Sequence, residues 1–229
     1  MAQLLVLVHT LPPLVEQFTA LCEEMLPGVR LLHVLDEPLL ERIRRHGAAT
    51  PEDNERLGDH VQIAEAVGAS AVLVTCSTVS LSVDAIRDRF RVPIIKIDEA
   101  MAAEAVQLGS RIAIVATNVT TVEPSRQLII EAARRAGCTV TIRLRPVAGA
   151  LEALLRGDPV EHDRLVERAV RQEAGRCDVV LLAQASMARV LDAMSGSPLP
   201  SPVLTSPRLA LADVGRKLVT GAVGAGGGR

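Results

Sequence analysis

The sequence predicts an α/β fold built from two pseudo-symmetric halves, each a mainly parallel sheet flanked by helices. Short runs of aliphatic and β-branched residues alternate along the chain with longer amphipathic stretches. Such an alternation of strands and helices is typical of parallel sheets whose faces are covered by helices. The alternation also repeats, because segments of the first half recur about 108 positions later, as with Pro51 and Pro159.

The composition agrees with this fold class and excludes several functions. The 229 residues include no Trp, no Tyr and two Phe, so the core must be aliphatic, which suits buried parallel strands. A chain of this length can form one large domain or two smaller ones with cores of useful size. The net charge is −2 without a long run of one sign, and stacking aromatics are scarce. We therefore expect neither a nucleic-acid surface nor a basic membrane-binding face.

The N-terminal apolar run Leu4–Val8 reads as a first strand rather than as a signal peptide. No basic residue precedes it, and Pro12 and Pro13 follow it in place of a cleavage site. No apolar stretch reaches the length of about 18 to 20 residues that a membrane helix needs. The four cysteines show neither CxxC spacing nor clustering with histidine, so we expect a cytoplasmic, reduced protein without a metal site.

In the first half, β-branched apolar runs predict strands and amphipathic stretches, two of them opening on a proline, predict helices. The expected strands are Leu4–Val8, Val29–Val34, Ala71–Thr75 and Pro93–Ile97, and the expected helices are Pro13–Met25, Pro51–Val67 and Val79–Phe90.

The rest of the chain follows the same criteria. Its expected strands are Arg111–Ala116, Thr139–Leu144, Asp178–Ala183 and Val203–Thr205, and its expected helices are Ala100–Leu108, Glu123–Ala136, Val147–Arg156 and His162–Ala174.

The repeat indicates how the halves divide the chain. The segment from Pro51 to Leu57 resembles the segment from Pro159 to Leu165, and Val72–Thr78 aligns with Val180–Ser186 in the same register. Two unrelated α/β halves would share the strand–helix pattern, but the agreement of Pro, Arg-Leu and Glu-Ala in one register favours duplication. We expect a first half of residues 1–98 plus 203–220, a second half of residues 99–202, and a glycine-rich disordered tail at 221–229.

The candidate site lies where polar residues follow the strands, because open α/β sheets bind ligands at the carboxyl ends of their strands. Cys76, with Ser77 and Thr78, follows the strand Ala71–Thr75 and precedes a helix. A helix N-terminus lowers a thiol pKa and supplies donors to a carboxylate. A lone cysteine is more often a small buried hydrophobe, but the hydroxyls beside Cys76 and its place at the ligand edge favour a reactive thiol.

A second polar group follows the strand Arg111–Ala116 and consists of Thr117, Asn118, Thr120 and Thr121. Helix capping by Thr121 would account for one of the four, and together they suit a bound anion. His9 and Thr10 occupy the equivalent place in the first half. His9 is either a structural residue or, if it lies near the thiol, a base toward Cys76.

Three motifs resemble, in order, those of the aspartate/glutamate racemase superfamily, which includes hydantoin racemases, maleate isomerase and arylmalonate decarboxylase. They are Val74–Thr78, Arg111–Thr117 with Thr120 and Thr121, and Leu181–Ala188. The resemblance implies two pseudo-symmetric halves with a small carboxylate-bearing substrate in the cleft between them, no cofactor, and a homodimer. It also implies that Cys76 is the catalytic thiol of the first half. In the family, residues matching Thr78, Thr117, Thr120 and Thr121 bind the substrate carboxylate.

The chain departs from the family pattern at Gln184, which stands where the resemblance implies a second cysteine, with Ser186 two residues later. Racemisation needs a base on one face of the α-carbon and an acid on the other, and an amide cannot exchange a proton at neutral pH. One-thiol chemistry therefore fits better: protonation after decarboxylation, isomerisation by thiolate addition, or racemisation with a different second group. Gln184 and Ser186 are expected to hold a substrate carboxylate or amide.

Three functions follow. The first is an isomerase of the racemase type that acts on a small carboxylate or amino-acid-like substrate through Cys76. The second is a thiol hydrolase in which His9 activates Cys76. The third is a carboxylate-binding protein that has lost catalysis, which the missing second thiol suggests.

Overall fold

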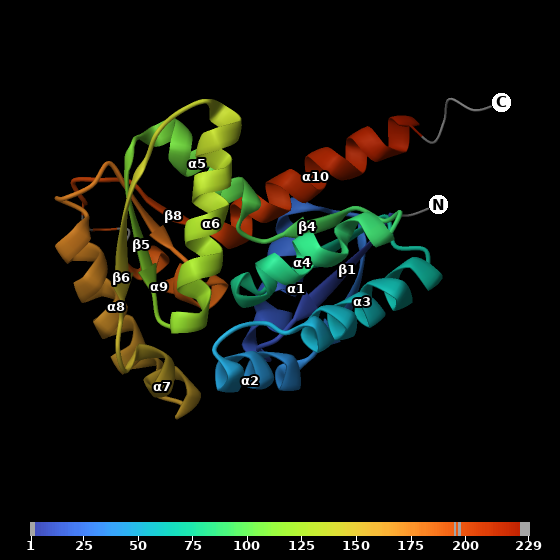
Figure 1. The fold of residues 1–229 in the computed structure, drawn as a ribbon, viewed down its shortest axis with the longest axis horizontal. Coiled ribbons are helices and arrows are strands. Elements are labelled where there is room, and N and C mark those ends of the chain that lie inside the picture. The colour runs from blue at the N-terminus through green and yellow to red at the C-terminus, as the bar shows by residue number, and fades with distance from the viewer. Residues whose placement is uncertain (1–2, 195, 197, 225–229) are drawn as a thin grey trace. The chain divides into compact units, whose positions relative to one another are not determined.

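The computed structural model describes residues 3–194, 196 and 198–224 and divides the chain into two compact units. Unit 1 comprises Met1–Ile97 with Pro207–Arg229, and unit 2 comprises Asp98–Ser206. Each unit contains a four-stranded parallel sheet, with the strand order β2-β1-β3-β4 in unit 1 and β6-β5-β7-β8 in unit 2. The α/β class with two helix-flanked parallel sheets is thus confirmed (Figure 1).

In unit 1, β1 lies at the centre of the sheet, between β2 and β3. The strands are β1 Leu4–His9, β2 Arg30–Leu35, β3 Ala71–Val74 and β4 Ile94–Lys96; the α-helices are α1 Pro13–Met25, α2 Glu37–His46, α3 Pro51–Ala66, α4 Ser80–Ile86 and α10 Ser206–Gly224; and the 3₁₀ turns are η1 Ser77–Val79 and η2 Arg87–Arg89.

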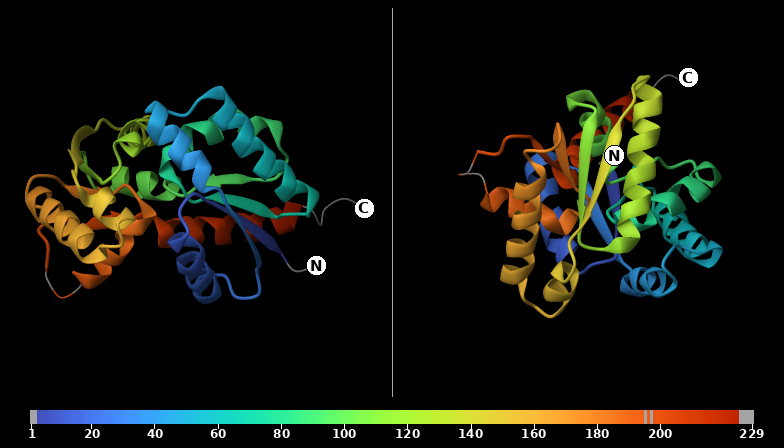
Figure 2. Two further views of the ribbon diagram at one scale, coloured as in Figure 1. Left: turned by 90° about the horizontal axis from the view of Figure 1, so that it is seen from below. Right: turned by 60° about the vertical axis from the view of Figure 1, so that its left-hand side comes forward.

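Strands β1, β3 and β4 of unit 1 are buried on both faces, as strands of parallel sheets generally are, whereas the edge strand β2 is partly exposed. Because successive side chains of a strand point to opposite faces, Val6 and Val8 pack with residues of α2, α3 and α4, such as Leu57. Leu7 and His9, on the other face, are also fully buried. The left panel of Figure 2 shows α1 on the side of this sheet opposite α2 and α3.

In unit 2, β5 lies at the centre of the sheet, between β6 and β7. The strands are β5 Arg111–Ala116, β6 Thr141–Pro146, β7 Val179–Leu182 and β8 Val203–Thr205; the α-helices are α5 Glu99–Leu108, α6 Val119–Ala136, α7 Ala150–Leu155, α8 Pro159–Glu173 and α9 Ala188–Ala193; and the 3₁₀ turn is η3 Ala185–Met187.

The core of unit 2 follows the same alternation. Ala113 and Val115 of β5 pack with residues of α7, α8 and α9, such as Val166. Ile114 points to the other face, where it lines a small internal void with Leu128 of α6 and residues of α5. Figure 1 shows α6 and α8 on opposite sides of β5 and β6.

The strand registers of the two units repeat with the offsets of the sequence. Val8 of β1 pairs with Val74 of β3, and Val115 of β5 pairs with Leu182 of β7, at offsets of 107 and 108. The helices that follow also begin alike: the Thr50 side chain accepts the Asp53 N–H at the start of α3, and Asp158 accepts the Glu161 N–H at the start of α8. The strand ends of the two units therefore correspond residue by residue.

Several boundaries differ from those expected from the sequence. Strand β8 pairs with β7, so residues 203–206 belong to unit 2 rather than to the first half. Helix α6 begins at Val119, not near Glu123, because the Asn118 side chain caps it and Pro124 lies inside it. Helices α2, α9 and α10 were not expected. Helix α10 extends to Gly224, within the segment expected to be a disordered tail, and residues 225–229 lie outside the described part of the chain.

Candidate active site

The polar residues singled out in the sequence fall at the strand ends of both units. The first strand-end site, in unit 1, comprises His9, Thr10, Thr75, Cys76, Ser77 and Thr78. The second strand-end site, in unit 2, comprises Thr117, Asn118, Thr120, Thr121, Gln184 and Ser186. Each site is built from the ends of two adjacent parallel strands, β1 with β3 and β5 with β7.

Cys76 lies between the end of β3 and the 3₁₀ turn η1. Its backbone is extended, with φ −120° and ψ 111°, and its carbonyl accepts the Val79 N–H at 3.2 Å. The turn directs the amides of Thr78 and Val79 toward the sulfur, and the side chain itself is partly exposed. The thiol is thus held at the start of a helical segment, as the sequence predicted.

Two opposing effects act on the Cys76 thiol. Burial of the sulfur raises its pKa above the usual range of a cysteine. The Thr10 and Thr78 hydroxyls and the Thr78 and Val79 amides interact with the sulfur and lower the pKa, because donors favour the charged form. Burial outweighs them, so the resting group is a thiol surrounded by donors that would stabilise the thiolate.

The hydroxyls around Cys76 are buried. Ser77 and Thr78 are 4% and 5% exposed, and Thr10 is 2% exposed. The Ser77 hydroxyl has no hydrogen-bond partner among the described residues, whereas the Thr10 hydroxyl interacts with the sulfur of Cys76. Buried hydroxyls normally find a partner, so the Ser77 hydroxyl is available to a ligand that enters beside Cys76.

His9 lies at the end of β1, and both of its ring nitrogens bond to residues other than Cys76. It is fully buried; its Nδ1 atom lies 2.8 Å from the Thr75 hydroxyl and its Nε2 atom 2.9 Å from Nδ1 of His33. Burial, and secondarily the neighbouring His33, lowers the pKa of His9 to about 4. With both nitrogens engaged, His9 offers no free atom to a substrate or to the thiol in this structure. His33 was not singled out in the sequence, although a histidine within the apolar run Leu31–Leu35 is a usable signal.

In the second strand-end site, the Gln184 side chain is held at both ends of its amide. Its Oε1 atom accepts the Thr117 backbone N–H at 3.0 Å, and its Nε2 atom donates to the Thr121 hydroxyl at 3.3 Å. Gln184 follows β7 as Cys76 follows β3, and it also precedes a 3₁₀ turn. Ser186, partly exposed, lies in that turn, η3.

The first turn of α6 carries unsatisfied hydroxyl groups. The Asn118 side chain caps this helix by accepting the Thr120 N–H at 3.2 Å. The Thr117 and Thr120 hydroxyls are buried and have no partner among the described residues. Free hydroxyls beside a helix N-terminus suit a carboxylate or another anion, because the helix dipole is positive at that end.

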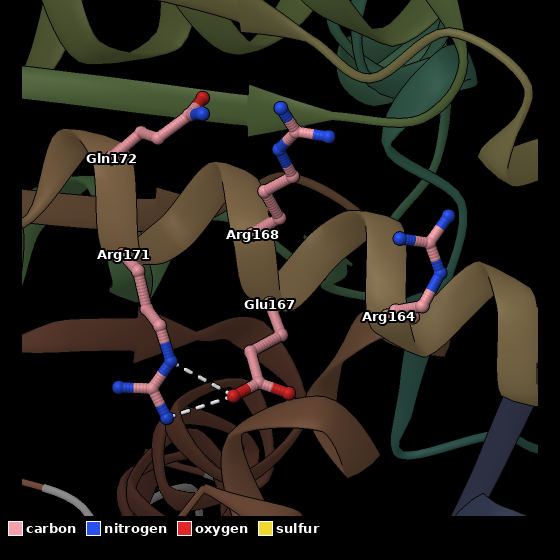
Figure 3. Close-up of a pocket in the computed structure, with 5 residues that line it drawn as sticks. All are labelled: Arg164, Glu167, Arg168, Arg171 and Gln172. Atoms are coloured by element: carbon pink, nitrogen blue, oxygen red, sulfur yellow. Dashed lines mark hydrogen bonds and ion pairs between the residues drawn. The ribbon is translucent and has the colours of Figure 1, made fainter.

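A hollow in unit 2 lies away from the strand ends, along α8. It has a volume of about 400 Å³ and is lined by Arg164, Glu167, Arg168, Arg171 and Gln172. Figure 3 shows that all five come from one helix. Arg171 binds Glu167 at 2.7 Å. The hollow contains no nucleophile and no unpaired acid, so it does not compete with the strand ends as a catalytic site.

Within the described residues, no helix is both long enough and apolar enough to cross a membrane.

The sequence and the fold were compared with those of known proteins. Residues 13–214 match the family model described as Asp/Glu/Hydantoin racemase. No curated protein sequence matches significantly. Among solved structures, a glutamate racemase from Bacillus anthracis is similar with a TM-score of 0.75 and 13% identity, over 95% of this chain and 82% of that one.

Two other structures are similar over most of their length. An aspartate racemase from Picrophilus torridus matches with a TM-score of 0.71 and 13% identity, over 95% of this chain and 94% of that one. An allantoin racemase from Klebsiella pneumoniae matches with a TM-score of 0.70 and 16% identity, over 96% and 89%. At these identities the structural similarity establishes only the fold. The family model, in contrast, matches most of the sequence and therefore establishes the family. The chain therefore belongs to the Asp/Glu/hydantoin racemase family.

Proposed function

We propose that this racemase-family enzyme acts on a small carboxylate or amino-acid-like substrate, with Cys76 as its one acid–base or nucleophilic thiol. The observation that carries the proposal is the set of donors around the sulfur, from Thr10, Thr78 and Val79. A structural cysteine needs no such set, whereas a thiol that must cycle between charged and neutral forms does.

The chemistry requires few groups. A proton next to a carboxylate is weakly acidic, so its removal needs a positioned base and donors for the developing enolate-like charge. In the proposal, Cys76 exchanges the proton with the α-carbon. The unpartnered hydroxyl of Ser77, in the same strand-end site as Cys76, is a proposed donor to the substrate carboxylate. Because the thiol itself transfers the proton, this scheme needs no cofactor.

Gln184 favours a reaction in which a proton is transferred on only one face of the α-carbon. Its amide is engaged with Thr117 and Thr121 and cannot transfer a proton. A single thiol would exchange the α-proton on one face, which permits stereospecific protonation or isomerisation. Racemisation would require a second acid–base group other than Gln184.

The substrate class is proposed from the family and its similar structures. Relatives of this fold are named as racemases of glutamate, aspartate and allantoin. These compounds and the hydantoins share an acidic C–H beside a carbonyl or carboxylate. The scarcity of aromatic residues favours a small aliphatic substrate over an aryl one.

A binding protein without catalysis is the second candidate, and the amide at position 184 is the observation that favours it. The thiol hydrolase has less support, because both nitrogens of His9 are bonded to other residues.

Incubation with candidate substrates in D₂O distinguishes these possibilities. Deuterium at the α-carbon, observed by NMR and lost in Cys76→Ala, supports the enzyme. Binding of a candidate by calorimetry without exchange, decarboxylation or isomerisation would instead favour the binding protein.

A further inference from the structure

A chain of five polar contacts crosses unit 1 next to Cys76. The Thr75 hydroxyl lies 3.1 Å from the Val8 carbonyl and 2.8 Å from Nδ1 of His9. The chain continues from Nε2 of His9 to Nδ1 of His33 at 2.9 Å, and from Nε2 of His33 to the Thr19 hydroxyl at 3.2 Å. It ends at the carbonyl of Val15, 2.8 Å from the Thr19 hydroxyl. The chain thereby joins α1, β1, β2 and the end of β3.

The two imidazole rings meet edge to edge. Their planes differ by 17° and their centroids are 5.2 Å apart, whereas the facing nitrogens are only 2.9 Å apart. Nearly coplanar rings with this separation point a nitrogen of one ring at a nitrogen of the other, so the contact is a hydrogen bond along the ring edges. One of the two nitrogens must therefore carry the hydrogen and the other a lone pair.

When both imidazole rings are neutral, this series of five contacts has too few hydrogens for every contact to be a hydrogen bond. Each hydroxyl contributes one hydrogen and each neutral imidazole one, which gives four hydrogens for the five contacts. Burial lowers the pKa of both His9 and His33, and His9 titrates at about 4, so both rings are neutral near pH 7. One of the five contacts must then lack a hydrogen.

The contact without a hydrogen belongs at the outer end of the chain. The Val8–Thr75 and Thr75–His9 contacts are fully buried, and an unsatisfied group there carries the full cost of desolvation. The contacts of Thr19 are only partly buried, so water can replace the missing partner. The Thr75 hydroxyl must therefore donate to Val8 and accept from Nδ1 of His9. It follows that Nε2 of His9 accepts from Nδ1 of His33.

We propose that His9 and His33 are both protonated on Nδ1, and that His9 is a positioning residue that fixes Thr75 and, through it, the backbone that carries Cys76. Thr75 is held by its own N–H, which donates to the Val8 carbonyl at 3.0 Å, and by its hydroxyl. Cys76 follows directly, and the donors from η1 reach the sulfur only while that backbone keeps its position. The catalytic consequence rests on the proposed function, but the protonation pattern does not.

The protonation pattern is tested by long-range ¹⁵N–¹H NMR on protein labelled at its histidines, at pH 7.5 and without substrate. The signals of the pair are assigned by their loss in His9→Asn and His33→Asn. The expected spectrum has a protonated Nδ1 and an unprotonated Nε2 on both rings. A protonated Nε2 on either ring would overturn the proposal.

The positioning role is tested by the rate at which iodoacetamide alkylates Cys76, followed by mass spectrometry in a Cys138→Ser background, because Cys138 is exposed and would also react. His33→Leu removes the donor to His9. We expect alkylation at pH 8 to slow about fivefold, as for the loss of one ordinary buried hydrogen bond, with the rate at high pH unchanged. His33→Asn, whose amide can donate in place of Nδ1, should restore the rate.

His162→Asn is the matched control, since His162 is a fully buried histidine of unit 2. It should leave the alkylation of Cys76 unchanged. Equal rates in wild type and His33→Leu, or failure of His33→Asn to restore the rate while it folds normally by circular dichroism, would contradict the positioning role. Neither measurement needs a substrate, so a failure here is distinct from a failure of the proposed function.

Discussion

The side-chain carbonyl of Gln184 accepts the backbone N–H of Thr117 at 3.0 Å, so the amide after β7 is fastened to the end of β5. The corresponding residue after β3 is Cys76, whose sulfur interacts with the hydroxyl of Thr10 at the end of β1. The same position of the repeat thus carries a thiol in one unit and a hydrogen-bonded amide in the other. The first prediction follows from this difference.

Gln184→Cys should add a second acid–base group where the family resemblance implies one. We expect α-proton exchange in D₂O to be accompanied by inversion in this variant, as measured by NMR and chiral chromatography of the product. Gln127→Cys, at an exposed position of α6, is the matched control and should behave as wild type. If the wild-type protein inverted the substrate as fast as it exchanges the α-proton, proton transfer would not be limited to one face, and the role given to Gln184 would be wrong.

His9 should make the protein sensitive to acid. Its pKa falls from 6.5 to about 4 on folding, so its contribution to stability is complete above pH 6.5 and is lost as the pH falls toward 4. A shift of this size corresponds to about 3 to 4 kcal/mol. Urea unfolding between pH 7.5 and 4.5 should therefore show a smaller loss of unfolding free energy for His9→Asn than for wild type. His46→Asn, at an exposed site, should leave the slope unchanged. Parallel slopes for wild type and His9→Asn would refute this prediction.

Asp36 should be a major source of stability in unit 1. This buried carboxylate caps α2 through the Leu39 N–H and is bound from α3 by Arg56, at 2.6 Å, and by His60, at 2.6 Å. Asp36→Asn removes the charge and leaves these donors poorly matched, so we expect a loss of about 2 to 4 kcal/mol in urea unfolding.

Glu41→Gln is the control for Asp36, because the ion pairs of Glu41 are exposed and should be worth less than about 1 kcal/mol. Equal effects of the two substitutions would show that the Asp36 contacts do not stabilise the fold.

Gly109 should tolerate no side chain. A Cβ at this position would lie 2.3 Å from Cβ of Asp178, whose carboxylate binds the Ser110 and Arg111 amides and the Arg111 guanidinium. Those contacts lower the pKa of Asp178 to about 2, the Arg111 side chain contributing most. Gly109→Ala must displace Asp178, and we expect a loss of about 1 to 3 kcal/mol in thermal unfolding.

Gly175→Ala is the control for Gly109, since a Cβ there meets nothing within 4 Å. It should change the unfolding free energy little. A similarly small effect of Gly109→Ala would contradict the prediction, because Asp178 would then move aside without a loss of unfolding free energy.

The sequence predicted the sheets well because most strands of these parallel sheets are short apolar runs with clear limits. The repeat could be predicted because Val72–Thr78 and Val180–Ser186 agree in one register of the sequence, and the strand pairings of the two units keep nearly the same offset. Helix α2 is not evident in the sequence because half of its residues are charged and only Leu39, Leu40 and Ile43 are buried. The sequence predicts that α6 begins near Glu123, because proline usually opens a helix, but Pro124 lies within this helix.

At the site, the position of Cys76 and its flanking hydroxyls at the end of a strand could be predicted from the sequence. The contacts of Thr10 with Cys76 and of His9 with His33 could not, because they depend on the pairing of β1 with β2 and β3. The catalytic use of His9 considered from the sequence assumed a free imidazole nitrogen. The structure instead places Thr75 and His33 on those two atoms.

The most direct test of the proposed function is α-proton exchange in D₂O, measured by ¹H NMR for aspartate, glutamate, allantoin and simple hydantoins with wild type, Cys76→Ala and Cys138→Ser. We predict that at least one of these compounds gains deuterium with wild type and with Cys138→Ser, and that Cys76→Ala, with an unchanged circular dichroism spectrum, gives none above the uncatalysed rate. Exchange by Cys76→Ala at the wild-type rate would show that Cys76 is not the group that moves the proton.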